Sequence, residues 1–177
     1  MRIINPIVCA CLLVLTSCVS ATLSEPSVCD TVTLGSLPNI PVGAVTIPPT
    51  TFSTPYLDYS NVVTKVTDIA NQVNVAVNQL TLTNTVGDMS WVSSIDVYIT
   101  GSDPASQPVL IATYAPASNM VSSSLDLSVQ IDSAMLMPYL EVPFKLTFTL
   151  SGSAPNQPVN IDTTVCVSMS GQFNQSE

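Results

Sequence analysis

Hydrophobic and polar residues alternate with a period of two over most of the chain beyond residue 73. The alternation is clearest between Leu125 and Ile131, where aliphatic residues alternate with Asp, Ser and Gln. Successive side chains of a β-strand point to opposite faces, so this pattern predicts strands with one buried and one solvent-facing side. The segments that show it are residues 73–82, 95–99, 109–114, 125–131, 142–150 and 159–169.

Two segments have a different pattern. Between Tyr59 and Val73, apolar residues recur at intervals of three and four, which predicts an amphipathic helix with Ser60 as its N-cap. The many valines weaken this prediction, because β-branched side chains destabilise helices. Residues 132–140 predict a short helical turn, capped by Asp132 or Ser133 and limited in length by Pro138.

Seven or more short strands separated by turn residues are typical of an all-β fold. We expect an antiparallel β-sandwich, with a β-barrel as the alternative. The proline-rich stretch from Asp30 to Pro55 suits short edge strands and extended connections. The sequence therefore predicts a single β-sandwich domain over residues 29–177, with one possible amphipathic helix and one helical turn.

The N-terminus has the features of an export signal. Arg2 precedes an apolar run from Ile7 to Leu15, which is too short to span a membrane as a helix. The run ends in Leu15-Thr16-Ser17-Cys18, which resembles the lipobox of bacterial lipoproteins. In that family the cysteine thiol is diacylated, the peptide is cut before the cysteine, and the new α-amine is usually acylated too. The alternative is an ordinary signal peptide cut near Ala21, which would discard Cys18.

The lipobox resemblance implies how the N-terminus is processed and where in the cell the protein is located. Residues 1–17 would be a signal peptide, Cys18 the lipid-bearing first residue, and residues 18–28 a tether between lipid and fold. Several acyl chains give stable anchoring, where a single chain is marginal. Val19 follows Cys18, so the aspartate that resembles an inner-membrane retention signal in enteric bacteria is absent. We therefore expect the outer membrane or cell surface of the bacterial envelope rather than the inner membrane.

Charge excludes several classes of partner. Beyond residue 17 the basic side chains are Lys65 and Lys145 alone, against 12 acidic residues, and the chain has no histidine. Such a chain cannot neutralise phosphates, so we expect no nucleic-acid binding. Anionic lipid surfaces should repel it, so the lipid is the expected membrane contact. The low charge, with abundant Ser, Thr and branched residues, is typical of an extracytoplasmic β protein.

Two cysteines remain besides Cys18 in the expected mature chain. An even pair in an exported protein predicts a disulfide between Cys29 and Cys166. The alternative is two separate buried thiols. Cys166 has the opposite parity to Val165 and Val167, so the bridge should cross an outer face or edge of the sandwich. Two cysteines without a histidine cannot supply a usual zinc site.

Catalytic chemistry has little support. Without histidine the usual serine and cysteine hydrolase arrangements are excluded, and neither lysine has the spacing of a Ser–Lys dyad. We predict that the protein is not an enzyme and binds no cofactor. Scattered aspartates could form a calcium cage, but turn aspartates normally satisfy local backbone donors, so no metal site is predicted. The four aspartates considered are Asp103, Asp126, Asp132 and Asp162.

Aromatic residues are the remaining candidates for ligand contact. Trp91 and Tyr98 could offer a flat apolar face to a sugar, and Tyr98 shares the outward parity of Asp96. Packing in the core or at its rim is the competing interpretation for both. We therefore expect a non-catalytic, lipid-anchored envelope protein that binds another protein or has a structural role. The alternative is a glycan-binding module that uses exposed aromatic side chains.

Overall fold

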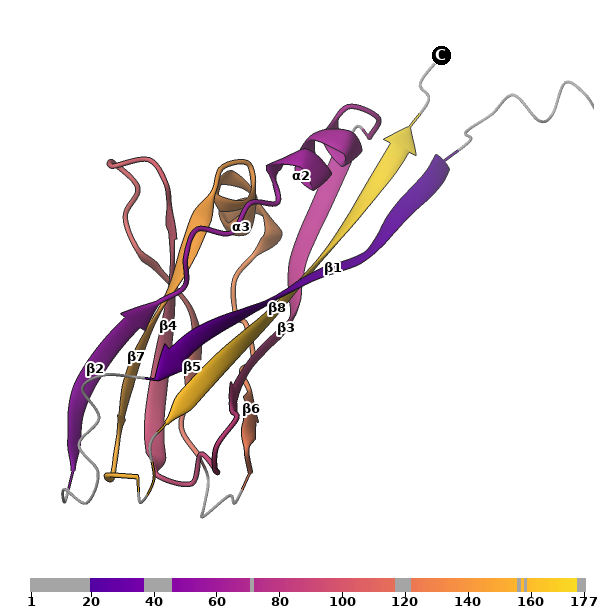
Figure 1. Cartoon of the computed structure of the whole chain (residues 1–177). Coiled ribbons are helices and arrows are strands. Elements are labelled where there is room, and N and C mark those ends of the chain that lie inside the picture. Colours follow the sequence, from indigo (N-terminus) through magenta and orange to yellow (C-terminus); the bar gives the residue numbers. More distant parts are fainter. Residues whose placement is uncertain are drawn as a thin grey trace, which may run out of the picture.

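The computed structural model describes residues 20–36, 46–70, 72–116, 122–155, 157 and 159–174. The predicted signal peptide, residues 1–17, and Cys18 lie outside this part of the chain. Figure 1 shows the described elements. They are β1 (Ser20–Ser36), β2 (Ile47–Ser53), α2 (Ser60–Thr67), β3 (Gln72–Asn84), β4 (Val92–Gly101), β5 (Val109–Tyr114), β6 (Ser124–Asp126), α3 (Ser133–Leu140), β7 (Phe144–Gly152) and β8 (Asn160–Asn174).

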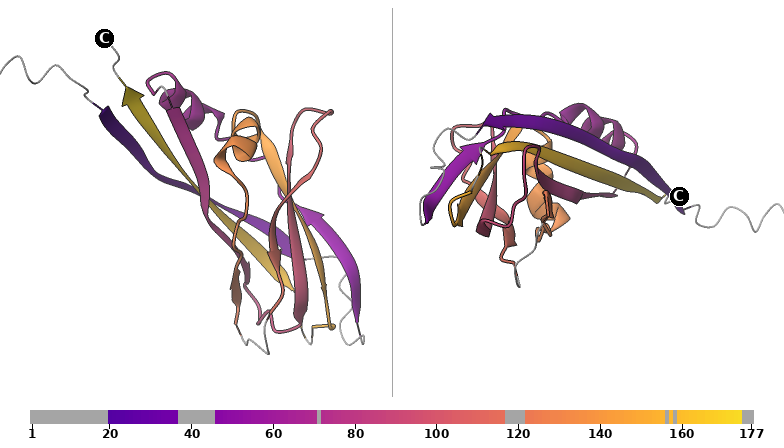
Figure 2. Two further views of the ribbon diagram at one scale, coloured as in Figure 1. Left: turned by 180° about the vertical axis from the view of Figure 1, so that it is seen from behind. Right: turned by 60° about the horizontal axis from the view of Figure 1, so that its bottom comes forward.

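The strands form two four-stranded antiparallel sheets, ordered β1-β8-β3-β6 and β2-β7-β4-β5. The first strand lies beside the last, and the chain passes repeatedly from one sheet to the other (Figures 1 and 2). This order is that of an eight-stranded jelly roll, a β-sandwich built from two Greek keys. The predicted all-β antiparallel sandwich is confirmed.

The inward faces of the two sheets form one hydrophobic core. Phe148 of β7 and Leu82 of β3 are both 0% exposed, and every second residue is buried from Ile95 onward in β4 and from Phe144 to Leu150 in β7. Burying a side chain of this size stabilises the fold by about 1.5–3 kcal/mol. The period-two pattern therefore predicted the core because each strand has one face against the other sheet. The buried members of these strands and of β8 include Ile95, Val97, Ile99, Leu146, Leu150, Ile161, Val165 and Val167.

The strand predicted for residues 125–131 is only partly formed. β6 ends at Asp126, although the Leu127 N–H still donates to the Leu80 carbonyl at 2.8 Å. The chain then leaves β3 and pairs with β5 of the other sheet, where Val129 forms an isolated bridge with Ala112. The alternation persists through this segment because Leu127 stays buried against the core while the strand changes sheets.

The tether predicted for residues 18–28 is replaced by a strand from Ser20 onward. β1 pairs with β8 from Ser20↔Asn174 to Ser36↔Asn160, which satisfies the backbone of this segment. The register shifts between Glu25 and Val28, on either side of Pro26. Proline has no N–H to donate to a ladder, and a bulge accommodates it. The described fold therefore begins two residues after Cys18.

Both predicted helical segments are helical, but their limits differ from those expected. α2 is eight residues long instead of extending to Val73, because Gln72 already belongs to β3. Its N-cap is Tyr59 and not Ser60; the Asp58 carboxylate instead accepts bonds from the Ser60 N–H and hydroxyl, at 3.0 and 2.6 Å. These bonds lower the pKa of Asp58.

α3 follows Asp132 as its N-cap, as expected, but Pro138 lies inside the helix instead of ending it. Within the described residues, no helix combines the length and the apolar character that crossing a bilayer requires.

Tyr59 connects α2 to the first sheet. Its ring is 1% exposed and stacks on Phe144 with ring centroids 5.8 Å apart, and its hydroxyl donates to the Val165 carbonyl at 3.4 Å. Burial raises the pKa of Tyr59, and a hydrogen bond and the charge of Asp30 raise it further. The phenol is therefore a packed structural group that stays protonated.

Candidate functional site

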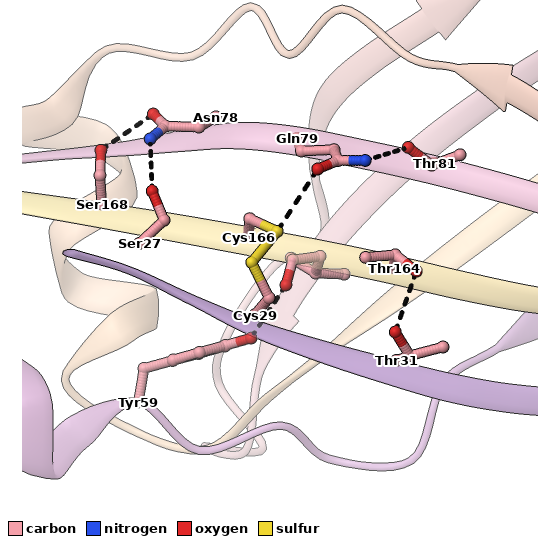
Figure 3. Close-up of a disulfide and its surroundings, with 11 residues drawn as sticks. Ser27, Cys29, Thr31, Tyr59, Asn78, Gln79, Thr81, Thr164, Cys166 and Ser168 are labelled. Atoms are coloured by element: carbon pink, nitrogen blue, oxygen red, sulfur yellow. Dashed lines mark hydrogen bonds between the residues drawn. A yellow bond between two sulfur atoms is a disulfide. The ribbon is translucent and has the colours of Figure 1, made fainter.

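The Cys29–Cys166 disulfide joins β1 to β8 directly across the sheet. The two residues are partners in the strand register, with Cα atoms 4.1 Å apart, and they are 137 positions apart in sequence (Figure 3). The predicted pairing is confirmed. Val165 and Val167 face the core, and Cys166 lies on the opposite face beside Gln79, whose Oε1 is 3.6 Å from the sulfur. The bridge therefore lies on an outer face, as the parity indicated.

Hydroxyl groups pair across neighbouring strands on the outer faces of both sheets. Beside the disulfide, the Thr31 and Thr164 hydroxyls are 3.0 Å apart, and the Thr81 hydroxyl donates to the Asp126 carboxylate at 2.6 Å (Figure 3 shows the first pair). Such cross-strand hydrogen bonds stabilise a sheet. The other pairs of this kind are Thr83–Ser124, Thr51–Thr149, Ser53–Thr147 and Ser94–Ser151.

Tyr98 lies in the middle of β4 on the outer face of the second sheet. It is half-buried, and its partners in the register are Thr147 of β7 and Leu110 of β5. Neither partner is aromatic, so no flat aromatic platform forms across these strands at this position. Tyr98 keeps the outward direction that its parity predicted.

Trp91 precedes β4 and is 6% exposed, so most of its ring is packed against the core. Its indole N–H donates to the Asp88 carbonyl at 3.0 Å, and its own carbonyl accepts from the Ser153 N–H at 2.8 Å. Seven residues of extended chain separate it from Tyr98, or roughly 23 Å. The structure therefore does not bring the two candidate ligand contacts together, and Trp91 is no exposed stacking surface.

A hollow of about 310 Å³ lies beside Trp91, between the β3–β4 and β7–β8 connections. We call it the distal pocket, because these connections lie at the end of the molecule opposite Ser20, where β1 begins (Figure 1). Its lining is mostly polar. The residues that line it are Asn84, Gly87, Asp88, Ser90, Trp91, Ser153, Ala154, Pro155 and Gln157.

Hydrogen bonds fix the polar side chains of the distal pocket. Asn84, which is 5% exposed, donates from Nδ2 to the Asp88 carbonyl at 3.0 Å and accepts from the Asn160 N–H at 3.2 Å. The Asp88 carboxylate accepts bonds from the Ser90 N–H and hydroxyl. These bonds lower the pKa of Asp88, so the carboxylate stays ionised at neutral pH. Sequence reasoning missed Asn84 and Asp88; the Gly87-Asp88 turn was the available signal.

The four aspartates considered for calcium are held by separate local contacts or lie on separate elements. Asp103 accepts a backbone N–H two residues along the chain at 2.8 Å, and Asp126 accepts the Thr81 hydroxyl. Asp132 occupies the N-cap position of α3, without a side-chain hydrogen bond to the helix. Asp162 faces outward from β8 in register with Thr33 and Thr83. Across the described ranges, no group of three or more His, Cys, Asp or Glu side chains is placed to hold a metal ion.

Lys145 and Lys65 lie on different elements. The Lys145 ammonium group lies 5.9 Å from the centre of the Tyr56 ring, a cation–π contact on the polar face of β7. Lys65 is exposed in the last turn of α2. Within the described residues, no hydrogen bond joins either lysine to a serine hydroxyl, so no Ser–Lys pair is assembled there.

Comparison with known proteins assigns no family. No family model matches the chain, and no curated protein matches it. Among solved structures, a chain from Desmodium yellow mottle tymovirus is similar at 12% identity and a TM-score of 0.36, covering 90% of this chain and 91% of that one. A chain from turnip yellow mosaic virus is similar at 14% identity and a TM-score of 0.33, covering 90% and 84%. At these TM-scores the similarity carries no argument about function.

Proposed function

We propose that this protein is a non-catalytic, lipid-anchored domain of the bacterial cell envelope, held through Cys18, with a protein-binding or structural role. The observation that carries the proposal is the Cys29–Cys166 disulfide. Disulfides persist in oxidising compartments outside the cytoplasm, which agrees with the export signal that residues 1–17 resemble. The hydroxyl-paired outer faces and the acidic composition suit a domain that the lipid alone holds at the membrane.

The arrangement of the strands supports an anchor at this end of the chain. β1 begins at Ser20, two residues after Cys18, and pairs with β8 over the full length of both strands (Figure 2). The disulfide joins these two strands, so a lipid on Cys18 would be connected to the sandwich by paired strands instead of a loose linker. The distal pocket would then face away from the membrane.

The glycan-binding alternative with exposed aromatics finds less support. It needs a flat, accessible ring, and Trp91 is 6% exposed. Tyr98 is half-buried between a threonine and a leucine. Neither side chain forms a stacking platform, so a sugar would need another kind of site.

The anchor is tested by expressing the full chain in a bacterial host that is fed a radiolabelled or alkyne-tagged palmitate. We expect the wild-type protein to take up label and to partition into the detergent-rich phase of Triton X-114, and the Cys18→Ser variant to lose both properties. Cys11→Ser, in the segment that cleavage should remove, is the matched control and should be labelled like the wild type. Mass spectrometry of the mature N-terminus completes the test. An unmodified N-terminus downstream of Cys18 would refute the proposal.

A further inference from the structure

We propose that the distal pocket binds a neutral, hydroxyl-rich small molecule of the size of a single sugar ring, such as a monosaccharide unit of a glycan. The inference concerns the pocket alone and does not depend on the lipid anchor. It also differs from recognition by exposed aromatics, because polar side chains would make the contacts and Trp91 would form one wall.

The size of the pocket sets the first limit on the ligand. Its volume of about 310 Å³ lies at the lower end of the range of small-molecule sites, roughly 300–1,000 Å³. It lies between residues 84–91 on one side and residues 153–155 with Gln157 on the other, and backbone bonds tie the first connection to β8 and the two connections to each other. The Thr85 N–H donates to the Asn160 carbonyl at 2.9 Å, and the Ser153 N–H donates to the Trp91 carbonyl. The walls are therefore already in place without a ligand.

The chemistry of the walls sets the second limit. Among the described residues that line the hollow, Asp88 supplies a carboxylate and none is basic, so an anionic ligand would be repelled. An apolar ligand would remove the polar lining groups from water without replacing their hydrogen bonds, which is unfavourable. The Gln157 amide can donate and accept, as sugar hydroxyls do. The Ser90 hydroxyl gives its proton to Asp88 and can still accept a hydrogen bond. A neutral polyhydroxylated molecule matches this set.

Asp88 is the expected anchor of the ligand. One oxygen of its carboxylate already accepts from Ser90, which orients the group, and the side chain as a whole is exposed toward the hollow. Hydrogen bonds from a neutral donor to a charged acceptor are about twice as strong as those between neutral groups. We therefore expect Asp88→Asn to weaken binding roughly tenfold or more.

Gly87 offers a way to block the pocket without disturbing the fold. A Cβ added there would lie 3.5 Å from Asn84 Nδ2 and 3.8 Å from Gln157 Oε1, which are ordinary van der Waals distances. Gly87→Leu should therefore be tolerated, with its side chain between the two walls of the hollow. Ala76→Leu is the matched control, because Ala76 is exposed on β3 and does not line the pocket.

The single tryptophan of the chain, Trp91, lines the pocket and reports on it directly. The full chain, purified in detergent, is titrated with glucose, galactose, mannose and N-acetylglucosamine up to about 10 mM, a range that detects millimolar affinities. We expect a saturable change in Trp91 fluorescence with at least one sugar, kept in Ala76→Leu and lost in Gly87→Leu.

Three outcomes would overturn the inference: no response to any of the four sugars, a response that persists in Gly87→Leu, or a response to ethanolamine with none to the sugars. The last outcome would assign the pocket to a cation. Circular dichroism of Gly87→Leu checks that the variant is folded, and if it is not, Asp88→Asn replaces it in the comparison. None of these results bears on Cys18, so this inference and the lipid anchor can fail separately.

Discussion

Replacing both Cys29 and Cys166 with alanine removes the covalent link between β1 and β8, and the size of the effect can be worked out from the chain. The two residues are 137 positions apart. In the chain-entropy model, closing a loop of this length lowers the entropy of the unfolded chain by about 17 cal/mol/K, or about 5 kcal/mol at 25 °C. Domains are typically stable by about 5–15 kcal/mol, so the loss is a large fraction of the total.

Urea unfolding, followed by Trp91 fluorescence, measures the change in the free energy of unfolding. We expect the double variant to lose about 3–5 kcal/mol, with a fall in melting temperature on the order of 10 °C. The urea dependence should become steeper, because the unfolded chain without the link exposes more surface.

The wild-type protein treated with dithiothreitol is the control. The reduced protein lacks the disulfide but keeps both sulfur atoms. It therefore separates the effect of the disulfide from that of the cavity that forms in the alanine variant, where the largely buried Cys166 side chain is shortened. The treated wild type and the double variant should agree to within about 1 kcal/mol. A reduced wild-type protein as stable as the oxidised one would refute the reasoning, since the link would then not restrain the unfolded chain.

Three further predictions follow from single contacts. Gly152→Ala should destabilise the fold by about 3 kcal/mol, because the added Cβ would collide with the Trp91 backbone carbonyl group, and thermal melting measures the loss. Thr163→Val should stabilise the fold by about 1 kcal/mol, as measured by urea unfolding, because the Thr163 side chain is 0% exposed and its hydroxyl has no hydrogen-bond partner within the described residues. A destabilised variant would show that the Thr163 hydroxyl does have a hydrogen-bond partner. Ser90→Ala should raise the pKa of Asp88 toward its ordinary value of 3.8, as followed by the carboxyl carbon in NMR. Because the folded pKa of Asp88 is depressed, its contribution to stability is present above pH 3.8 and is lost as the pH falls through the folded pKa. If the titration midpoint of Asp88 is the same in Ser90→Ala as in the wild type, the hydrogen bonds from Ser90 are not the cause of the lowered pKa.

The strands of the core could be predicted from the sequence because each has one face against the opposite sheet. Ile95, Val97 and Ile99 alternate with polar residues for that reason alone. The same rule could not locate the change of sheet after Asp126, because Leu127 and Val129 keep facing the core whichever sheet supplies their backbone partners. The alternation of apolar and polar residues therefore predicts which side chains are buried, but it does not predict which strands pair.

The first half of β1 has no sequence pattern that predicts a strand. Residues around Glu25 and Pro26 do not alternate, and they form a strand because β8, more than 130 residues away, offers a complete row of backbone partners. The Cys29–Cys166 link was predictable from cysteine count and parity. The distal pocket was not, because Asn84 and Ser153 belong to connections that meet only in the folded molecule.

The position of the disulfide along β1 has a mechanical consequence. If a lipid on Cys18 holds the protein while its partner pulls on the sandwich, the load enters β1 at Ser20 and is resisted by the backbone bonds to β8. Those bonds can separate only over the nine residues from Ser20 to Val28, because Cys29 is covalently fixed to Cys166. Beyond that point the disulfide transfers the load to β8, so further extension requires β8 to separate from β3. The bridge therefore limits how far β1 can be peeled from β8 before strands of the core have to separate.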